Sequence, residues 1–199
     1  MSPRIRPYSP ADRDAILDVC VRTAFHGDDA RGHLTTPELY AEIWALPYVD
    51  LEPDLAFVID DGARAVGYVL GVADSATFRT RAEREWFPAA RERHPRSASE
   101  DPRESWLLDI LHAPLGPEPA SVAGFPAHLH IDGLPVAQGG GWGRRLVETL
   151  CAELRRRGVP GLHLGVSDQN ERALAFYQHL GFSRAGSGPG VVYLTLSLG

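Results

Sequence analysis

A run of glycines is the strongest chemical signal in this sequence. Gln138-Gly139-Gly140-Gly141-Trp142-Gly143 lies between a strand-like stretch and an amphipathic helical stretch. At such a junction, unpaired backbone N–H groups and the positive end of the helix dipole converge and form an anion site. Glycine is needed because a Cβ atom would hold a pyrophosphate away from the main chain. Arg144 and Arg145 in the first helical turn can add positive charge.

Two common classes of phosphate loop do not fit these glycines. The run lacks the Gly-Lys-Ser/Thr ending of nucleoside triphosphatases. No acidic residue follows about twenty residues later at the end of a next strand, as dinucleotide-binding folds require. The sequence therefore indicates a different phosphate-bearing cofactor.

A second group of chemically active residues precedes the glycines. His128, His130 and Asp132 alternate along a strand-like stretch and therefore share one face, with Leu129 and Ile131 opposite. Histidine titrates near neutral pH, and a carboxylate two residues away can orient it or raise its pKa. This face is our candidate for a general base. The alternative is that the three side chains only satisfy hydrogen bonds within the fold.

Other site chemistries find no support in the spacing of residues. The eight histidines include no zinc-binding pattern, so we expect no metal site. No Gly-x-Ser-x-Gly nucleophile turn occurs. Cys20 and Cys151 each lie in an apolar helical pattern, and we expect both to be buried core residues.

Charge and length limit the class of protein. The net charge is −6 and no basic block occurs, which argues against a nucleic acid or a membrane surface as partner. No apolar run reaches the length of a membrane span, and no targeting segment is apparent, so a cytoplasmic protein is expected. The 199 residues suit a single domain, 1–199, acting as a monomer or homodimer.

The elements around these residues follow from periodicity and turn signals. We expect an extended start at 4–8, then a helix after Ser9-Pro10 that buries Ile16, Val19, Cys20 and Thr23. A second helix is expected over 37–46 with a Thr36 cap, and an antiparallel hairpin over 55–60 and 66–73. Later elements alternate: strand 127–133, helix 142–157, strand 162–166, helix 170–180 and hairpin 182–198.

Residues 77–124 interrupt this order and are interpreted as an insertion. They contain a charged helical segment around 83–93, several prolines and an apolar patch at 106–111. A connection of this length often forms a lid or binding loop, so a role over the active site is one hypothesis. A surface excursion without function is the other.

Two motifs resemble the GNAT superfamily of N-acetyltransferases. Its signature, Gln/Arg-x-x-Gly-x-Gly/Ala, is filled by Gln138, Gly141 and Gly143. A second signature, an Asn before a helix that carries an aromatic pair and ends in Gly-Phe, is filled by Asn170, Ala173, Phe176, Tyr177, Gly181 and Phe182. The stretch from Ala127 to Asp132, with Leu134-Pro135, is similar to the acetyltransferase-like domain of O-GlcNAcases. The resemblance implies an α/β (α+β) GNAT fold: a mixed, mostly antiparallel sheet of about seven strands, with a helical insertion between the third and fourth.

The resemblance also implies roles for residues. The cofactor would be acetyl-CoA, bound by Ile131, Gly133, Leu134, Gln138, Gly139, Gly140, Gly141, Trp142, Gly143, Arg144, Asn170, Phe176 and Tyr177. Backbone groups of Ile131 and Gly133 would pair with the pantetheine arm, although the superfamily commonly has a β-branched residue in place of Gly133. Asn170 would contact the pantetheine or cap the next helix. Tyr177 would be the general acid, unless it is a packed core tyrosine, and His130 or Asp132 the base.

Two functions are consistent with these implications. The first is acetyl transfer to a primary amine of a small molecule or peptide by direct attack. The second is a catalytically silent acetyl-CoA-binding domain, since some O-GlcNAcase-like members resemble acetyltransferases without proven activity. The residues do not identify the acceptor, which the loop at 26–33 and the insertion are expected to contact.

Overall fold

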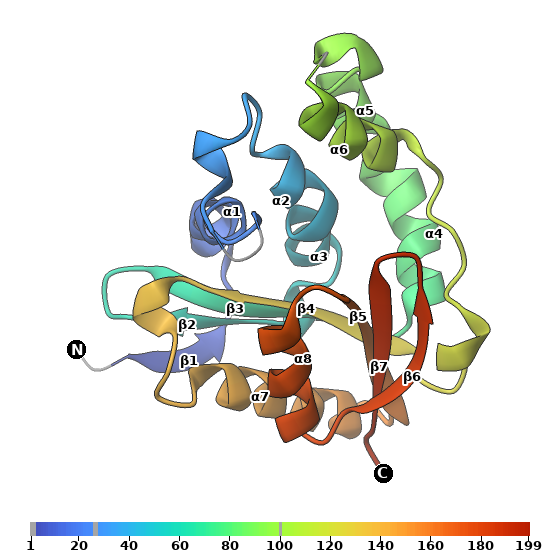
Figure 1. The fold of residues 1–199 in the computed structure, drawn as a ribbon. Coiled ribbons are helices and arrows are strands. Elements are labelled where there is room, and N and C mark those ends of the chain that lie inside the picture. Colours follow the sequence, from blue (N-terminus) through green and yellow to red (C-terminus); the bar gives the residue numbers. More distant parts are fainter. Residues whose placement is uncertain (1–2, 26–27, 100) are drawn as a thin grey trace.

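A seven-stranded sheet with the order β1-β2-β3-β4-β5-β7-β6 forms the centre of the molecule (Figure 1). The computed structural model describes residues 3–25, 28–99 and 101–199. The strands are β1 (Arg4–Pro7), β2 (Ala56–Asp60), β3 (Ala65–Val72), β4 (Ala127–Gly133), β5 (Gly161–Ser167), β6 (Ser183–Gly188) and β7 (Val191–Ser197). Neighbours pair antiparallel except β4 and β5, which are parallel. The predicted mixed sheet is confirmed.

Helices cover both faces of this sheet (Figure 1). α1 (Arg13–Val21), α2 (Leu39–Trp44) and α3 (Leu46–Leu51) lie on one face, and α7 (Trp142–Arg156) and α8 (Glu171–His179) on the other. α7 buries the predicted apolar stripe: Leu146, Val147, Leu150, Cys151 and Leu154. It approaches β3 closely at Gly71, where a Cβ atom would lie 2.5 Å from a methyl carbon of Leu150. Glycine at this position lets the helix lie against the sheet.

The parallel contact between β4 and β5 is short. It consists of Ala127 opposite Leu162 and His128 opposite His163, after which the strands separate. β4 nevertheless stays paired with β3 as far as Gly133. The centre of the sheet therefore contains a gap with β4 on one side.

Register determines which backbone groups of β4 face this gap. The N–H of Leu134 donates to the carbonyl of Val66, its directly opposite neighbour on β3. Because antiparallel pairing alternates, even-numbered residues of β4 bond to β3 and odd-numbered ones point their peptide groups away from it. The N–H and C=O groups of Ile131 and Gly133 thus face the gap.

The insertion forms three helices, α4 (Ser75–Glu85), α5 (Phe87–Arg93) and α6 (Pro102–His112), and these confirm a helical insertion between the third and fourth strands. The expected bounds of its first helix were wrong. The Asp74 carboxylate accepts from the N–H of Thr77 at 2.7 Å and starts α4 well before Glu83. The helix then breaks at Trp86, because Pro88 offers no N–H to continue it.

The second expected helix is also divided. α2 ends at Trp44, and α3 begins at Leu46 with Pro47 in its first turn, where a missing N–H costs nothing. The expected Thr36 cap was wrong too, since Glu38 occupies the cap position. The backbone N–H of Thr36 instead donates to the carboxylate of Glu104 in α6 at 2.5 Å.

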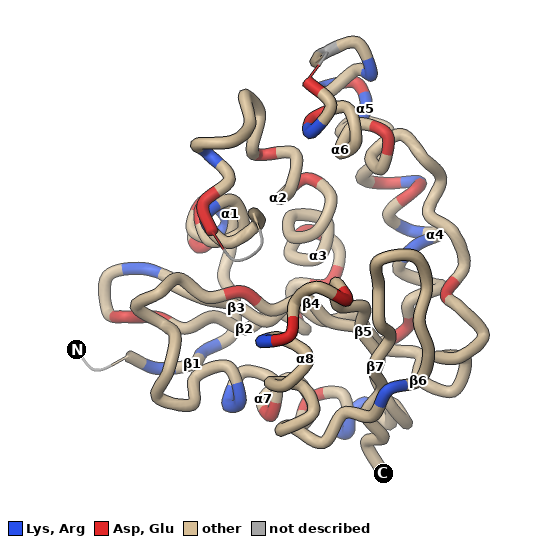
Figure 2. Tube along the Cα trace, viewed as in Figure 1, with Lys and Arg blue, Asp and Glu red and all other residues tan. Residues whose placement is uncertain are grey.

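The two cysteines are buried as expected. Cys20 and Cys151 are buried free thiols. Acidic and basic residues are interspersed along the elements (Figure 2). Within the described ranges, no helix has both the length and the apolar character to cross a membrane.

The Glu104 contact gives a test of how the insertion is held. Its side chain is only 1% exposed and accepts a hydrogen bond from a segment 68 residues away. Glu104→Ala should lower the free energy of unfolding by about 1–3 kcal/mol, because the Thr36 N–H loses its acceptor. Urea denaturation measures the change. Glu104→Gln keeps an acceptor oxygen and should lose less, and equal losses in the two variants would show that packing alone holds α6.

Candidate active site

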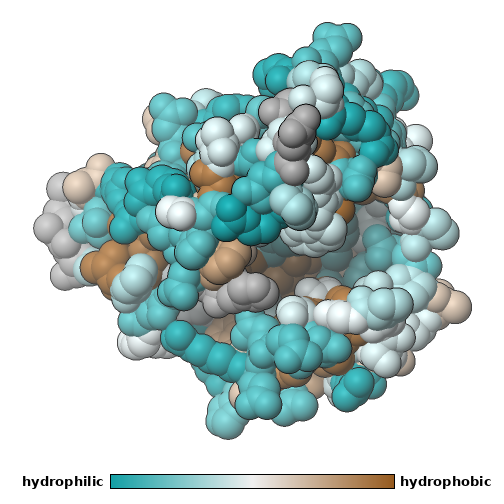
Figure 3. Space-filling view, turned by 45° about the horizontal axis from the view of Figure 1, so that its top comes forward, coloured by the Kyte–Doolittle hydropathy of each residue, from teal (hydrophilic) through white to brown (hydrophobic). Residues whose placement is uncertain are grey.

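A groove of about 350 Å³ lies at the C-terminal end of β4, beside the glycine loop, the start of α7 and α8. Figure 3 shows a hollow with apolar residues in its walls. The groove is lined by many of the predicted residues: Ile131, Asp132, Gly133, Gln138, Gly139, Gly143, Asn170, Phe176 and Tyr177. An adjoining cavity of about 420 Å³ is lined by Gly141, Trp142, Gly143, Arg144 and Arg172, among others. Residues from β4, the glycine loop, α7 and α8 thus form one continuous site.

The glycine loop has the backbone conformation that the sequence suggested. Gly139, Gly140 and Gly141 have φ values of 76°, 57° and 74°, in the left-handed region that other residues rarely adopt. Among the described residues, chain neighbours aside, no atom lies within 4 Å of a Cβ built on Gly139 or Gly141. In the described part of the chain, the N–H groups of these glycines, of Gly143 and of Arg144 have no hydrogen-bond acceptor. Several N–H donors are therefore free to bind an anion at the start of α7.

Side chains around the loop hold it in place. The Arg145 guanidinium stacks over the Trp142 ring at 3.6 Å and donates to the carbonyl of Gly140 at 2.9 Å. Gln138 donates through Nε2 to the carbonyl of Gly133 and accepts from Arg172 through Oε1, at 3.1 and 3.0 Å. The Gln138 amide thus connects β4 to α8.

Gly143 and Gly133 differ in how strictly they require glycine. A Cβ on Gly143 would lie 3.1 Å from the Phe176 ring, so a small residue lets α7 and α8 meet. A Cβ on Gly133 would meet only the Ala137 methyl at an ordinary 3.5 Å. Steric hindrance therefore does not explain why Gly133 stands where the superfamily commonly has a β-branched residue. Leu134, expected to bind cofactor, is 2% exposed and lies in the core, where its N–H pairs with Val66.

Asn170 and Tyr177 occupy the two ends of α8. The Asn170 side chain caps the helix by accepting from the N–H of Ala173 at 3.0 Å, which supports the capping alternative. Tyr177 is 7% exposed and packs against Phe176 and Phe182. Its hydroxyl has no hydrogen-bond partner among the described residues, and the residue lines the groove. Burial, and then the charge of Asp132, raise the pKa of Tyr177, so the phenol keeps its proton at neutral pH.

His130 and Asp132 do not form the expected pair. Burial raises the pKa of Asp132 to about 6, although its carboxylate accepts a hydrogen bond from the Tyr68 hydroxyl at 2.6 Å. Burial lowers the pKa of His130 to about 4. The expectation that a carboxylate would raise the histidine pKa was wrong, because desolvation dominates on this face. Asp132 lines the groove, whereas His130 lines a neighbouring cavity.

His128 fits the structural alternative. The Ser75 hydroxyl donates its one hydrogen to the carbonyl of Pro126 at 2.7 Å, so it accepts from Nδ1–H of His128 at 2.6 Å. Nε2 of His128 then accepts from the Tyr48 hydroxyl at 2.7 Å. Both ring nitrogens are satisfied in a neutral, half-buried imidazole.

The neighbouring cavity, of about 250 Å³, brings together residues that sequence analysis did not connect. Possible metal-ligating atoms of Glu118, His128 and His163 all lie within 4.8 Å of one another. The hydroxyl partners of His128 and the Arg79 guanidinium, 3.6 Å from Glu118, argue against a cation there. His163 and Arg79 instead hold the pKa of Glu118 below its ordinary value.

Arg172 was not expected at the site, and the loop at 26–33 was expected to contact the acceptor. Arg172 lines both the groove and the adjoining cavity, and only its place two residues after Asn170 could have indicated this. In the loop expected to contact the acceptor, His26 and Gly27 lie outside the described residues, and none of residues 28–33 lines the groove or the 250 Å³ cavity. The insertion does line that cavity.

Curated relatives include protein O-GlcNAcases and a mycothiol acetyltransferase. The chain is 24% identical over 180 residues to the protein O-GlcNAcase of Rattus norvegicus, a match over 89% of this chain and 20% of that protein. It thus spans about a fifth of the curated O-GlcNAcases that it matches. It is 29% identical over 189 residues to the mycothiol acetyltransferase of Jonesia denitrificans, covering 83% of this chain and 60% of that one.

Solved structures agree with the fold. The crystal structure of SsHAT is 45% identical, with a TM-score of 0.92 over 100% of both chains. The PaiA N-acetyltransferase of Thermoplasma acidophilum, solved with coenzyme A, shares the fold at 14% identity, with a TM-score of 0.58 over 99% of both chains. The family model described as acetyltransferase (GNAT) family matches residues 21–182. The chain therefore belongs to the acetyltransferase (GNAT) family.

Proposed function

We propose that this acyltransferase moves an acetyl group from acetyl-CoA directly to a primary amine, with both substrates bound at once. The observation that carries the proposal is the continuity of the glycine loop with a groove that contains Asp132 and Tyr177. Family membership supports acetyl transfer in general. The identity of each group that binds or reacts is our assignment.

The glycine loop and β4 fit the two polar parts of acetyl-CoA. Free N–H groups from Gly139 to Arg144 suit a pyrophosphate, and Arg172 adds a positive charge beside them. The peptide groups of Ile131 face the gap beside β5, where an extended amide chain can pair with them as an added strand would. Gly133 contributes less, since its carbonyl already accepts from Gln138.

Asp132 and Tyr177 can supply the proton transfers. Acetyl-CoA provides a thioester whose carbonyl carbon the amine attacks, so that a C–N bond forms and the C–S bond breaks. Asp132 accepts the proton that the amine nitrogen loses, and Tyr177 donates its proton to the departing sulfur. Solvent then restores both groups. His130, whose pKa is about 4, is the weaker base of the two candidates.

The silent-domain alternative explains the glycine loop but not Asp132 and Tyr177. A domain that only bound the cofactor would need neither a buried carboxyl with a pKa of about 6 nor a phenol without a hydrogen-bond partner. Perturbed titratable groups in a cleft are typical of catalytic sites.

Gly141→Glu should abolish binding of acetyl-CoA. The change forces a side chain into a left-handed position and places a negative charge where the pyrophosphate is assigned. Isothermal titration calorimetry measures affinity in the wild type and the variant. Gly158→Glu, at a left-handed glycine after α7 and away from the groove, controls for the strain of the substitution. If wild-type protein fails to bind at millimolar acetyl-CoA, the proposal is wrong.

Tyr177→Phe should lower kcat by about 10² to 10⁴-fold while the KM for acetyl-CoA changes little, because only a proton donor is removed. Release of free thiol from acetyl-CoA, in the presence of amines, is the measurement. Tyr40→Phe removes a phenol hydroxyl that lines neither the groove nor the cavity and should behave as wild type. A Tyr177→Phe variant that lost only affinity would assign the tyrosine to packing.

The pH profile should separate Asp132 from His130. To accept a proton, the Asp132 carboxyl must be ionised, whereas the His130 imidazole must be neutral. If Asp132 is the base, kcat/KM therefore rises with pH through about 6, the pKa of Asp132, and activity is lost below that pH. Asp132→Asn should remove this limb, and His130→Gln should leave it in place. The opposite result, a limb that disappears in His130→Gln and persists in Asp132→Asn, would make the histidine the base.

A further inference from the structure

The 250 Å³ cavity lies directly beside the proposed reaction centre. His130 lines this cavity and Asp132 lines the groove, and they are two apart on one face of β4, about 7 Å by strand geometry. The cavity lies where β4 and β5 begin to separate, at the His128–His163 pair. A molecule that extended from the groove past His130 would enter it.

The insertion contributes an apolar part of the cavity wall. Phe78, Phe87, Ile110 and Leu115 contribute side chains from α4, α5, α6 and the loop that follows α6. Trp106, at the start of the apolar patch 106–111, is 53% exposed, and its ring centroid lies 6.1 Å from that of Trp44. The lining suits a short hydrocarbon segment of a small molecule.

One end of the cavity carries charge, in the group Arg79, Glu118 and His163. Glu118 Oε1 lies 3.6 Å from Nη1 of Arg79, and its Oε2 lies 3.3 Å from Nε2 of His163. Nδ1 of His163 donates to the carbonyl of Phe125 at 2.6 Å, which fixes the ring. Both oxygens of Glu118 thus already face a side-chain nitrogen, one of Arg79 and one of His163.

Arg79 is the member of this group whose bonding is incomplete. Its guanidinium makes no hydrogen bond to any described residue, and Nη1 is buried without a hydrogen-bond partner. A guanidinium has five N–H donors in a planar fork, and a buried donor left without an acceptor is costly. Apart from the Glu118 carboxylate, whose Oε1 lies 3.6 Å from Nη1, the described residues offer the Arg79 guanidinium no acceptor.

We propose that this cavity binds a carboxylate of the acetyl acceptor through Arg79. The proposal rests on the proposed function and names its substrate class: a compact amine that also carries a carboxylate, with a short apolar spacer between them. An arginine fork matches a carboxylate with two parallel hydrogen bonds, which an uncharged amide cannot reproduce with equal strength. The apolar residues contributed by the insertion hold the spacer, and the amine is directed toward Asp132.

Binding of reaction products tests the proposal without any need for turnover. CoA-saturated protein is titrated by calorimetry with N-acetylglycine, N-acetyl-β-alanine and N-acetyl-4-aminobutyrate, and with the primary amide of each. We expect one chain length to bind best and its carboxylate to bind at least about tenfold more tightly than its amide. Equal affinity of acid and amide at every length would overturn the proposal.

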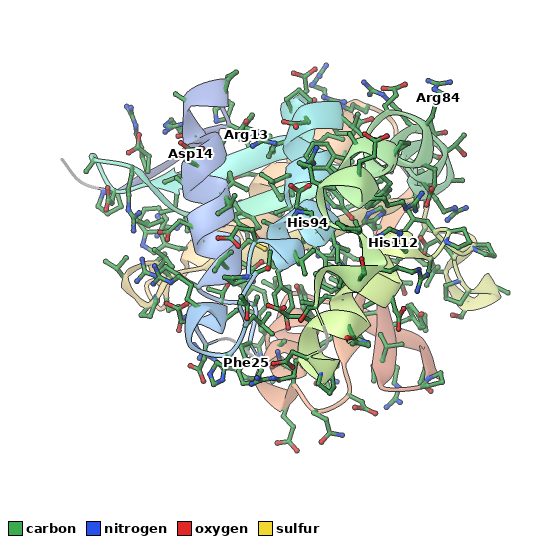
Figure 4. All side chains as sticks on the ribbon, turned by 90° about the horizontal axis from the view of Figure 1, so that it is seen from above. Arg13, Asp14, Phe25, Arg84, His94 and His112 are labelled. Carbon is green, nitrogen blue, oxygen red and sulfur yellow. The ribbon has the colours of Figure 1, made fainter. Side chains whose placement is uncertain are left out.

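Variants on α4 locate the interaction. Arg79→Gln should reduce the affinity for the best carboxylate by about ten- to a hundredfold and leave that for the amide unchanged. Arg79→Lys, which keeps the charge without the fork, should lie between, and it serves if the glutamine variant folds poorly. Arg84→Gln is the matched control, because Arg84 points away from the body of the molecule near the end of the same helix (Figure 4).

Two further outcomes are decisive. Tighter binding of a monoacetylated diamine than of the carboxylate of equal length would mean that Glu118 meets the ligand, which overturns the assignment to Arg79. A titration of acetyl-CoA on the same protein reports the groove separately. If acetyl-CoA does not bind, the proposed function is wrong. If acetyl-CoA binds but carboxylates bind no better than their amides, only the assignment of a carboxylate site at Arg79 is wrong.

Discussion

The early separation of β4 from β5 is the constraint on which the rest of the molecule depends. Two residue pairs join the strands, and beyond them the odd-numbered peptide groups of β4 have no strand to bond. Backbone polar groups within a sheet need partners, so such a gap must be filled by solvent or by a ligand. The glycine loop begins a few residues after β4 ends, which brings free N–H donors to the end of the same gap.

Burial around this gap sets the protonation of the reactive side chains. Desolvation favours the neutral form of every titratable group, so it raises the pKa of Asp132 and Tyr177 and lowers that of His130. A carboxyl that would be fully ionised at the surface thus titrates close to neutrality, and a phenol keeps its proton. One physical cause thus sets the protonation of both groups to which we assign the roles of base and acid, on two different elements.

The sequence predicted the elements whose signal is local. The glycine run, the stripe of α7 and the alternation in β4 each lie within a short window, and the structure has all three. Two helix boundaries were missed where Pro47 and Pro88 start new helices, since their effect depends on how the chain turns. Arg79, Glu118 and His163 come from segments far apart in sequence, and their proximity appears only after β4 and β5 align. The mistaken link between His130 and Asp132 came from spacing, which carries no information about desolvation.

The insertion has a consequence for how this protein can diversify. Its three helices contact α2 and α3 and one another, and Glu104 attaches them to Thr36, while the glycine loop lies with α7 and α8 on the opposite face of the sheet. The residues proposed to bind the cofactor and those that line the 250 Å³ cavity therefore belong to separate stretches of chain, and β4 is the element that contributes to both. Mutations accumulating in 75–124 can reshape the cavity while the glycine loop stays intact, so, with the acceptor bound as we propose, related chains can exchange acceptors through evolution of one segment.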